Sequence, residues 1–585
     1  MAYSLSPGVT WSEVDLTTIV PAASTTEGAF AGNFDWGPVD HIVTISNELD
    51  LVRWFGKPSQ NSYTAFFTAA NFLSYGNNLK VVRSANTIVD GAVNATTGAY
   101  GLTIKNEDDY ENNYALIGSA NTVPNTHGMF AAKYPGELGN SLKVSLWCGQ
   151  DSATFDSWEY SSQFEGVTGT SSYVSSKGGA NDEMHLIIVD RLGKFSNGEA
   201  NTVLERFSYV SKASDAVNDD GSSNFWVNVV NDKSQYLWAI NHALDEVTGV
   251  SETSSWGHPS STQNNTGHLV ATAYGQSNAS YTMGLFGGKV AAPTNAQLNS
   301  AYDLFLSAEE VDVSLIMTGD APQVVSEHVL DNIVGIRKDC VAFVSPDMAD
   351  VVDNAGSEVS DIVSKIDLYN STSFGIFDGN WKKQFDKYNN VYRWVPLNGD
   401  IAGLCARTDF DRDPWFSPAG FNRGQIKNVV KLAWNPTKAQ RDDLYKNNIN
   451  PVVTFKGEGT VLYGDKTMQR KPSAFDRINV RRLFIVLEKT ITKAAKYSLF
   501  EFNDEFTRAQ FVALVEPFLR DVKGRRGIYD FKVVCDTTNN TPEIIDRNEF
   551  RGDIYIKPAR SINFIQLNFV AVRTGVAFSE IVGKF

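Results

Sequence analysis

Long hydrophobic runs and cysteines are both scarce in this chain of 585 residues. No stretch approaches the roughly 18 uninterrupted apolar residues of a membrane-spanning helix. The opening MAYSLSPGVTWSEVD also lacks the basic, apolar leader of a signal peptide. We therefore expect neither membrane insertion nor secretion. The cysteines have no C-x-x-C spacing, which predicts buried, reduced thiols in a protein made in the cytoplasm. They are Cys148, Cys340, Cys405 and Cys535.

Catalytic and metal-binding signatures are missing too. There is no G-x-S-x-G nucleophile elbow, and the seven histidines are scattered without an H-E-x-x-H pair. GLFGGKV at 284–290 lacks the upstream glycine of a phosphate loop and carries Val290 where a magnesium-binding hydroxyl belongs. DFDRD at 409–413 begins like a calcium loop, but Pro414 replaces the required glycine, so a charged loop pairing with arginines is the plainer interpretation. The sequence predicts no enzyme activity, no cofactor and no metal.

Charge is unevenly distributed along the chain. The total is acidic, with 51 Lys+Arg against 67 Asp+Glu, yet residues 421–585 hold 28 basic and 18 acidic residues. Opposite charge on two parts of one chain favours directed association with a neighbour or partner, although two solvated surfaces of differing sign would look the same. The basic residues are interleaved with carboxylates and fit no recognised nucleic-acid module, so we expect no direct nucleic-acid binding.

Three lysines of this basic part share one face of an expected helix at 479–499. Lys489, Lys493 and Lys496 follow one another at i, i+4 and i+7. The face is either solvated or a docking strip for an acidic partner. The opposite stripe is apolar and is expected to pack inward; it consists of Leu483, Phe484, Leu487 and Ile491.

The length indicates several domains. A strand (311–318), a helix (324–336) and a second strand (340–346) form a β-α-β unit, which predicts a parallel pair. Residues 89–289 are rich in Gly, Ser, Thr and Asn with short strands between, among them FWVNVV at 225–230. The expected fold class is a multidomain α+β or α/β architecture. Its parts are an N-terminal arm (1–20), an α/β core (21–88 plus 290–455), a β-rich outer insertion (89–289) and a C-terminal domain (456–585) that ends in a strand arm.

The sequence predicts an isolated β-strand at each end of the chain. A strand of this kind leaves backbone groups unpaired and must pair with something. The apolar positions that mark the two arms are Val9, Trp11, Val14 and Leu16 at the N-terminus, and Ile562, Phe564, Ile565, Leu567 and Phe569 near the C-terminus.

Several long sequence motifs carry a family resemblance. They are LSPGV (5–9), FDWGPVD (34–40), NFLSYGNNLKVVR (71–83), YPGELGN (134–140), the run from Phe374 to Gly424, SAFDRINVRRLF (473–484) and VVCDTTNNTPEIIDRNEF (533–550). Outside 89–290, where the likeness lapses apart from YPGELGN, the chain resembles the tail sheath proteins of contractile-tailed, T-even-type bacteriophages.

The resemblance implies a structural subunit of the virion tail, assembled in the host bacterial cytoplasm. Such subunits stack as hexameric rings in a six-start helix around a tail tube, between the baseplate and the neck or tail terminator. On contraction they drive the tube through the host envelope and deliver the genome. Terminal arms add strands to sheets of neighbouring subunits, the insertion points outward, and the C-terminal domain lies near the tube. Lys489, Lys493 and Lys496 would then face the tube. An outer virion surface protein or a hydrolase on an α/β scaffold is the alternative.

Overall fold

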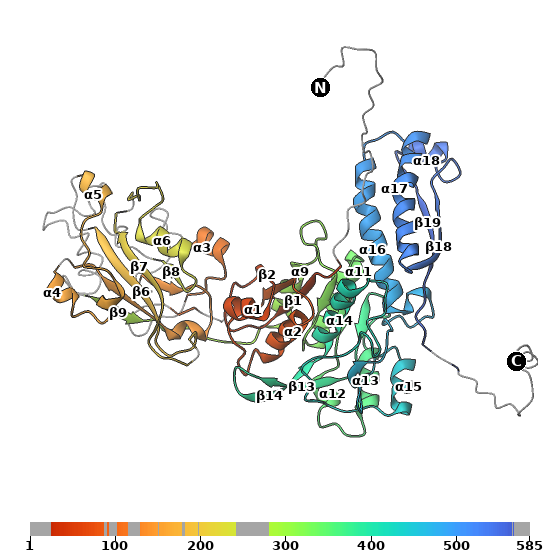
Figure 1. Cartoon of the computed structure of the whole chain (residues 1–585), viewed down its shortest axis with the longest axis horizontal. Helices are drawn as coiled ribbons and strands as arrows, with labels where there is room; N and C mark the ends of the chain where they lie inside the picture. The colour runs from red at the N-terminus through yellow and green to blue at the C-terminus, as the bar shows by residue number, and fades with distance from the viewer. Residues whose placement is uncertain are drawn as a thin grey trace, which may run out of the picture.

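The computed structural model describes residues 25–86, 91–92, 102–114, 129–149, 151–177, 182–196, 198–213, 215–240, 280–563 and 566. Figure 1 shows the inserted residues as a separate lobe on one side, the core in the middle and the C-terminal helices upright on the other side. Within these ranges, no helix has the length and apolar character needed to cross a membrane.

A six-stranded sheet forms the centre of the core. Its order is β12-β11-β10-β1-β3-β2, and all neighbouring pairs are parallel except β2 with β3. Because β1 pairs with β3 on one side and β10 on the other, segments before and after the insertion complete one sheet. The strands are β1 (Gly28–Gly32), β2 (Ile42–Ile45), β3 (Leu79–Arg83), β10 (Leu315–Met317), β11 (Val341–Val344) and β12 (Gly375–Phe377).

Helices cover both faces of this sheet. Phe30 points to the face covered by α2 (Tyr63–Leu73) and α14 (Asn398–Asp411), whereas Ala29 and Ala31 point to the other face. The helices α2 and α14 approach closely, since a Cβ on Gly399 would lie 2.4 Å from the Thr68 carbonyl oxygen. The other face is covered by α9 (Asn295–Asp303), α10 (Gln323–His328), the π-helical η6 (Val329–Val334) and α13 (Glu358–Asp367), and the short α11 (Gly335–Arg337) follows η6. The parallel β10–β11 pair predicted from the β-α-β unit is present.

Smaller elements complete the lower part of the core. A three-stranded antiparallel sheet has the order β14-β13-β15, and β16 pairs with β17 as a hairpin. The helix α1 (Glu48–Phe55) begins with a side-chain cap, because the Asn47 side chain accepts a hydrogen bond from the Asp50 amide. The remaining elements are α12 (Met348–Val351), β13 (Trp381–Asp386), β14 (Val391–Pro396), β15 (Lys431–Leu432), α15 (Lys438–Lys446), β16 (Val452–Phe455) and β17 (Gly459–Leu462).

The inserted lobe is built on an antiparallel sheet of order β7-β6-β5-β9, with a separate β4–β8 pair. The strand predicted at 225–230 is wrong: these residues enter the helix α6 (Trp226–Lys233). Trp226, Val229 and Val230 recur at helical spacing and are buried against the sheet, so tertiary packing overrides the β preference of valine. The other elements are α3 (Glu107–Asn113), β4 (Phe130–Ala132), η2 (Glu137–Ser141), β5 (Leu142–Trp147), α4 (Ser152–Phe155), η3 (Ser161–Gln163), α5 (Ser172–Ser176), β6 (Glu183–Asp190), β7 (Thr202–Ser211), β8 (Leu237–Ala239) and β9 (Tyr281–Gly284).

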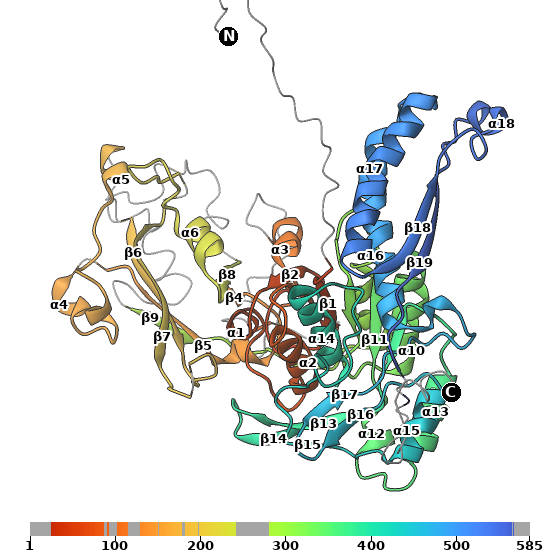
Figure 2. The same cartoon turned by 45° about the vertical axis from the view of Figure 1, so that its right-hand side comes forward.

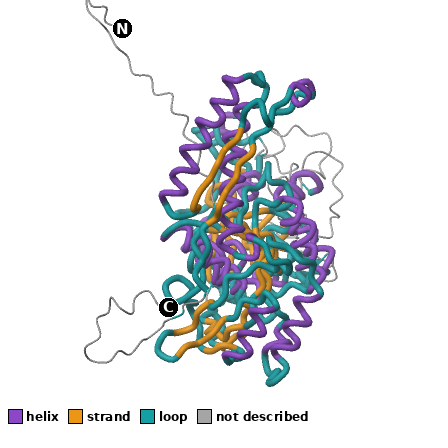
Figure 3. The backbone as a smooth tube through the Cα atoms, turned by 90° about the vertical axis from the view of Figure 1, so that its right-hand side faces the viewer, coloured by secondary structure: helices purple, strands orange, loops and turns teal. Residues whose placement is uncertain are grey.

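The C-terminal unit stands on the core. After the short η7 (Ala474–Asp476), it comprises α16 (Ile478–Ala495), η8 (Lys496–Ser498), α17 (Glu505–Gly524), β18 (Ile528–Val534), α18 (Pro542–Asp546) and β19 (Asp553–Pro558). Figure 3 shows the β18–β19 ribbon running beside the helices, against which its apolar face packs. Of the predicted arm positions, Ile562 is described and is 82% exposed. The others lie outside the described residues; they are Val9, Trp11, Val14, Leu16, Phe564, Ile565, Leu567 and Phe569.

Candidate functional site

The helix α16 is enclosed on two sides, where the C-terminal unit joins the core. Ile478 and Ile485 belong to the core cluster beneath the central sheet, whereas Leu483 and Leu487 pack against Trp415, α17 and the ribbon. Figure 2 shows α16 rising from the core next to α17. The sequence predicts one apolar stripe, but the structure buries a second one, because two different partners cover the helix.

Lys489 lies inside this junction, with its side chain only 7% exposed. Its Nζ is 2.7 Å from Asp312 Oδ1, and it donates to the Val313 carbonyl oxygen at 2.9 Å and to Ser314 Oγ at 3.0 Å. The prediction that Lys489 forms part of an exposed strip is therefore wrong. Helical spacing identifies a face of the helix, but the segment before β10 covers the part of that face where Lys489 lies.

The other two lysines of the predicted strip have different surroundings. Lys493 is half-exposed and its Nζ lies 3.5 Å from Asp312 Oδ2, while Lys496 is exposed on η8. Burial by itself would raise the pKa of Asp312, but the hydrogen bond and charge of Lys489, with a contribution from Lys493, hold that pKa below its usual value. Asp312 thus remains a carboxylate that binds the helix to the core.

The carboxylates of DFDRD serve the same junction. Asp409 forms an ion pair with Arg482 in which both side chains are almost fully buried, and Asp413 pairs with Arg525 at the end of α17. The predicted pairing with arginines is confirmed for Asp409 and Asp413, but the predicted loop is wrong for 409–411, which form the last turn of α14. Buried pairs of this kind are costly to break, because removal of one partner leaves the other charge in a poorly solvated place.

Arg481, which sequence reasoning missed, is held by aromatic rings rather than by a carboxylate. Its guanidinium carbon lies 4.2 Å from the ring centre of Phe374 and 4.0 Å from that of Phe475, and Nη2 donates to Ser373 Oγ at 2.8 Å. Burial lowers the pKa of Arg481 to about 10, so the group stays charged and interacts with the ring faces. A signal was present in the sequence, since a charged pair interrupts the apolar helix just after Val480.

Residues 561–563, which follow β19, are held by side chains of neighbouring segments. Ser561 Oγ donates to Asp465 Oδ2 at 2.6 Å, and the Asn563 amide lies 2.7 Å from the Tyr445 hydroxyl. Arg477 Nη1 lies 3.1 Å from Asp465 and joins both partners. Ser561 and Asn563 are therefore held in place by side chains of α15 and of the segment before α16.

Three of the sequence motifs that carry the family resemblance come together at Arg83. Its Nε, Nη1 and Nη2 donate to the carbonyl oxygens of Phe34 (2.8 Å), Gly37 (2.8 Å) and Pro135 (2.7 Å). Trp36 packs edge-on against Tyr134 with ring centres 5.4 Å apart. The contact between the core and the insertion is thus formed by three of these sequence motifs, FDWGPVD, VVR and YPGELGN. In the part of the chain that the structure describes, no group of three or more His, Cys, Asp or Glu side chains could hold a metal.

Comparison with known proteins identifies the family. The chain matches the phage tail sheath protein central domain over 291–468, the phage tail sheath C-terminal domain over 470–571 and the tail sheath protein Gp18 domain III N-terminal region over 29–83. It is also 34% identical to the tail sheath protein of Vibrio phage KVP40 over 684 aligned residues, covering 99% of this chain and 100% of the relative. The chain belongs to the phage tail sheath proteins.

Further relatives give the same result for this sheath protein. The tail sheath protein of Enterobacteria phage T4 is 34% identical over 696 aligned residues and 99% of each chain. Crystal structures of sheath tail proteins from Listeria innocua and Desulfitobacterium hafniense share the fold, each with a TM-score of 0.50, at 12% and 11% identity. They cover 92% and 94% of this chain and 96% and 100% of their own. This chain is thus a contractile tail sheath subunit of the T4 type and a component of the virion tail.

Proposed function

We propose that the subunits stack as hexameric rings in a six-start helix around a tail tube, between the baseplate and the neck or tail terminator. Contraction of this polymer drives the tube through the host envelope and delivers the genome. Assembly takes place in the host bacterial cytoplasm. The observation that supports a polymer of this kind is the β18–β19 ribbon, because among the described residues these two strands pair only with each other.

The ribbon is a natural acceptor for the arms of neighbouring subunits. A two-stranded ribbon is marginal by itself and presents free backbone groups along both edges. One face of this ribbon packs on the helices through Phe531, Val533, Ile554 and Ile556, which holds the strands in place for additional partners. Strands added from residues 1–20 of one neighbour and 561–573 of another would use main-chain hydrogen bonds worth about 0.5–1.5 kcal/mol each. A few bonds per arm, repeated through the lattice, keep the subunits connected while other contacts rearrange.

The energy for contraction is stored in the lattice in this proposal. The extended sheath is a kinetically trapped arrangement that passes to a better-packed one when triggered. The α/β core of 21–88 plus 290–455 and the C-terminal unit of 456–585 carry out the rearrangement. The insertion at 89–289 forms a peripheral domain that is dispensable for the core fold. The relatives that cover the whole chain are named tail sheath proteins, which favours this function over a hydrolase on an α/β scaffold.

The experiment that tests the role of the arms is removal of residues 1–20. We expect a folded, soluble protein that does not form tubes in electron micrographs, whereas the full chain forms them. A synthetic peptide of residues 1–20 should also inhibit tube formation by the full chain. The matched control is the same peptide with Val9, Trp11, Val14 and Leu16 replaced by serine. Normal tubes from the truncated protein contradict the proposed role of the arm.

A further inference from the structure

Among the described residues of the C-terminal unit, the largest group of exposed apolar side chains lies on the connection between α16 and α17 and the helix ends beside it, here called the aromatic loop and defined as residues 497–506. Five large apolar side chains project from it, with exposed fractions between 63% and 105%. They are Tyr497, Leu499, Phe500, Phe502 and Phe506. Such a concentration on a loop tip, without a covering element from the described part of the chain, is typical of a protein contact.

The conformation of the aromatic loop is fixed by internal bonds. Asn503 Nδ2 donates to the Glu549 carbonyl oxygen at 2.8 Å, and Asp504 caps α17 by accepting from the Thr507 amide at 2.8 Å. Phe500 adopts a left-handed backbone conformation with φ of 69°, which is uncommon for a bulky residue. The loop is therefore presented as a defined shape, which lowers the entropy lost on binding.

The charge of the aromatic loop has one sign. Glu501, Asp504 and Glu505 are exposed, and no ion pair within 4.0 Å joins them to the described residues. No lysine or arginine occurs between 497 and 506. A partner surface that is apolar and basic would complement the loop in both respects.

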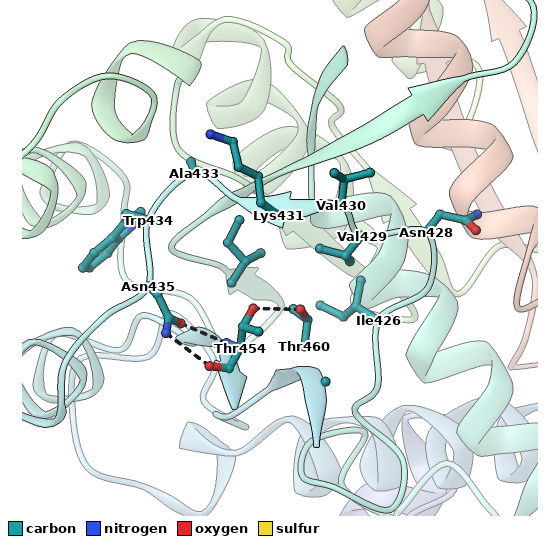
Figure 4. Close-up of a pocket in the computed structure, with 12 residues that line it drawn as sticks. Ile426, Asn428, Val429, Val430, Lys431, Ala433, Trp434, Asn435, Thr454 and Thr460 are labelled. Atoms are coloured by element: carbon teal, nitrogen blue, oxygen red, sulfur yellow. Dashed lines mark hydrogen bonds between the residues drawn. The ribbon is translucent and has the colours of Figure 1, made fainter. Parts of the chain in front are cut away.

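A surface of that kind exists on the same protein. A groove of about 690 Å³ lies between the segment leading into β15 and the β16–β17 hairpin, and we call it the basic groove. Figure 4 shows Ile426, Val429 and Thr460 gathered around it. The apolar part of its lining consists of Ile426, Val429, Val430, Leu432, Ala433 and Trp434. Lys431 also lines it, and the exposed Lys456 lies on the β16–β17 hairpin.

The two surfaces lie at opposite ends of the molecule. In Figure 2 the free end of the α16–α17 pair is at the top, and β15, β16 and β17 are at the bottom. One chain cannot bring its own loop to its own groove, so the partner of each is a different molecule. Two unlike, complementary patches on one chain produce a head-to-tail contact, and repetition of such a contact builds an open helical polymer.

We propose that the aromatic loop of one subunit docks in the basic groove of a second copy of this chain. This inference rests on the proposed function, namely that the protein polymerises. It adds to the strand arms a contact between folded surfaces, in which apolar rings are buried and carboxylates meet lysines. A contact of rigid parts can separate and re-form as subunits move, whereas the arms keep the chains connected.

Disulfide trapping tests the contact directly. Phe500→Cys and Val430→Cys are placed on separate, differently tagged full-length chains, which are mixed under polymerising conditions and oxidised. Both side chains are well exposed, so neither change disturbs packing. We expect a heterodimer that forms only when both variants are present. Leu192→Cys, an exposed site on the insertion, replaces Val430→Cys as the control and should give background cross-linking. Equal cross-linking to both sites overturns the inference.

Polymerisation provides a second readout. The double variant Phe500→Ser and Phe502→Ser should raise the critical concentration for tube formation about tenfold or more, since two buried rings are lost per contact. If the unchanged chain forms tubes and the variant does so at the same concentration, the inference fails and the proposed function stands. If the unchanged chain forms no tubes, the proposed function itself fails. Normal tubes that no longer assemble around tail tube protein would assign the aromatic loop to the tube and also overturn the inference.

Discussion

Lys489 Nζ lies 2.7 Å from Asp312 Oδ1, at a position where the lysine side chain is 7% exposed. The pair connects the middle of α16 to the segment that precedes β10. It therefore binds the C-terminal unit to the central sheet in the place where a sheath subunit must keep its two parts together.

Replacement of Lys489 by methionine should weaken this junction. The charged hydrogen bonds of Asp312 are lost while the volume of the side chain is kept, so we expect the unfolding free energy to fall by about 1.5–3 kcal/mol. The measurement is urea denaturation, with hydrogen exchange of the α16 amides as a local readout. Lys496→Met at an exposed position is the control and should change stability by less than about 0.5 kcal/mol. Equal effects of the two changes contradict a structural role for Lys489.

The same pair has a pH dependence of known sign. The folded-state pKa of Asp312 is lowered, because Lys489 outweighs the effect of burial. Its stabilising contribution is therefore present above the unfolded value of about 3.9 and is lost as pH falls through the folded value. The difference in stability between the Lys489→Met variant and the unchanged protein should accordingly begin to shrink as pH falls below about 4.

Asp378 should make the unfolding free energy depend on pH in the opposite direction, and at higher pH. The carboxyl is fully buried, and burial raises its pKa to about 7, although Ser345 Oγ donates to it at 2.6 Å. A raised carboxyl pKa means that the folded state holds its proton longer, so the contribution is favourable at low pH and falls as pH rises from about 4 to 7.

The variant Asp378→Asn removes this titration. Relative to it, the unchanged protein should lose on the order of 2–4 kcal/mol of unfolding free energy between pH 5 and pH 8. Urea denaturation at the two pH values gives the comparison. Parallel stability profiles for the two proteins would show that Asp378 does not titrate in this window.

Arg83 should be essential for the joint between core and insertion. Arg83→Met leaves the carbonyl oxygens of Phe34, Gly37 and Pro135 without their donor, which we expect to cost about 2–5 kcal/mol. Thermal unfolding followed by circular dichroism measures the loss. Arg520→Met removes an exposed arginine from α17 and is the matched control, with an expected effect within about 0.5 kcal/mol. A loss no larger than that of the control would mean that water replaces the guanidinium without cost.

Lys493 and Lys496 remain the candidates for a tube-facing surface. The double variant Lys493→Glu and Lys496→Glu, with Lys489 unchanged, should co-assemble less efficiently with tail tubes at low ionic strength and differ little at high salt. Exposed charge pairs are worth only about 0–1 kcal/mol each and are screened by salt. Lys438→Glu with Lys446→Glu on α15 is the control of equal charge change. If both doubles co-assemble alike, these two lysines face solvent.

Local features of the fold were predictable from the sequence because their causes are local. Asn47 followed by Glu48 and Asp50 fixes the start of α1, and two short apolar runs flanking a helix fix the parallel β10–β11 pair. Asp409 and Asp413 of DFDRD also pair with arginines, since a buried charge is costly unless it is neutralised.

The sequence by itself determined the family and the parallel β10–β11 pair, through sequence motifs and periodicities carried by neighbouring residues. Only the tertiary structure decided that Lys489 is buried, that 226–233 is a helix and that Arg83 brings together residues 34, 37 and 135. Periodicity tells which side chains share a face, but burial depends on which distant segment covers that face. That information resides in the packing of segments hundreds of residues apart, and no local pattern contains it.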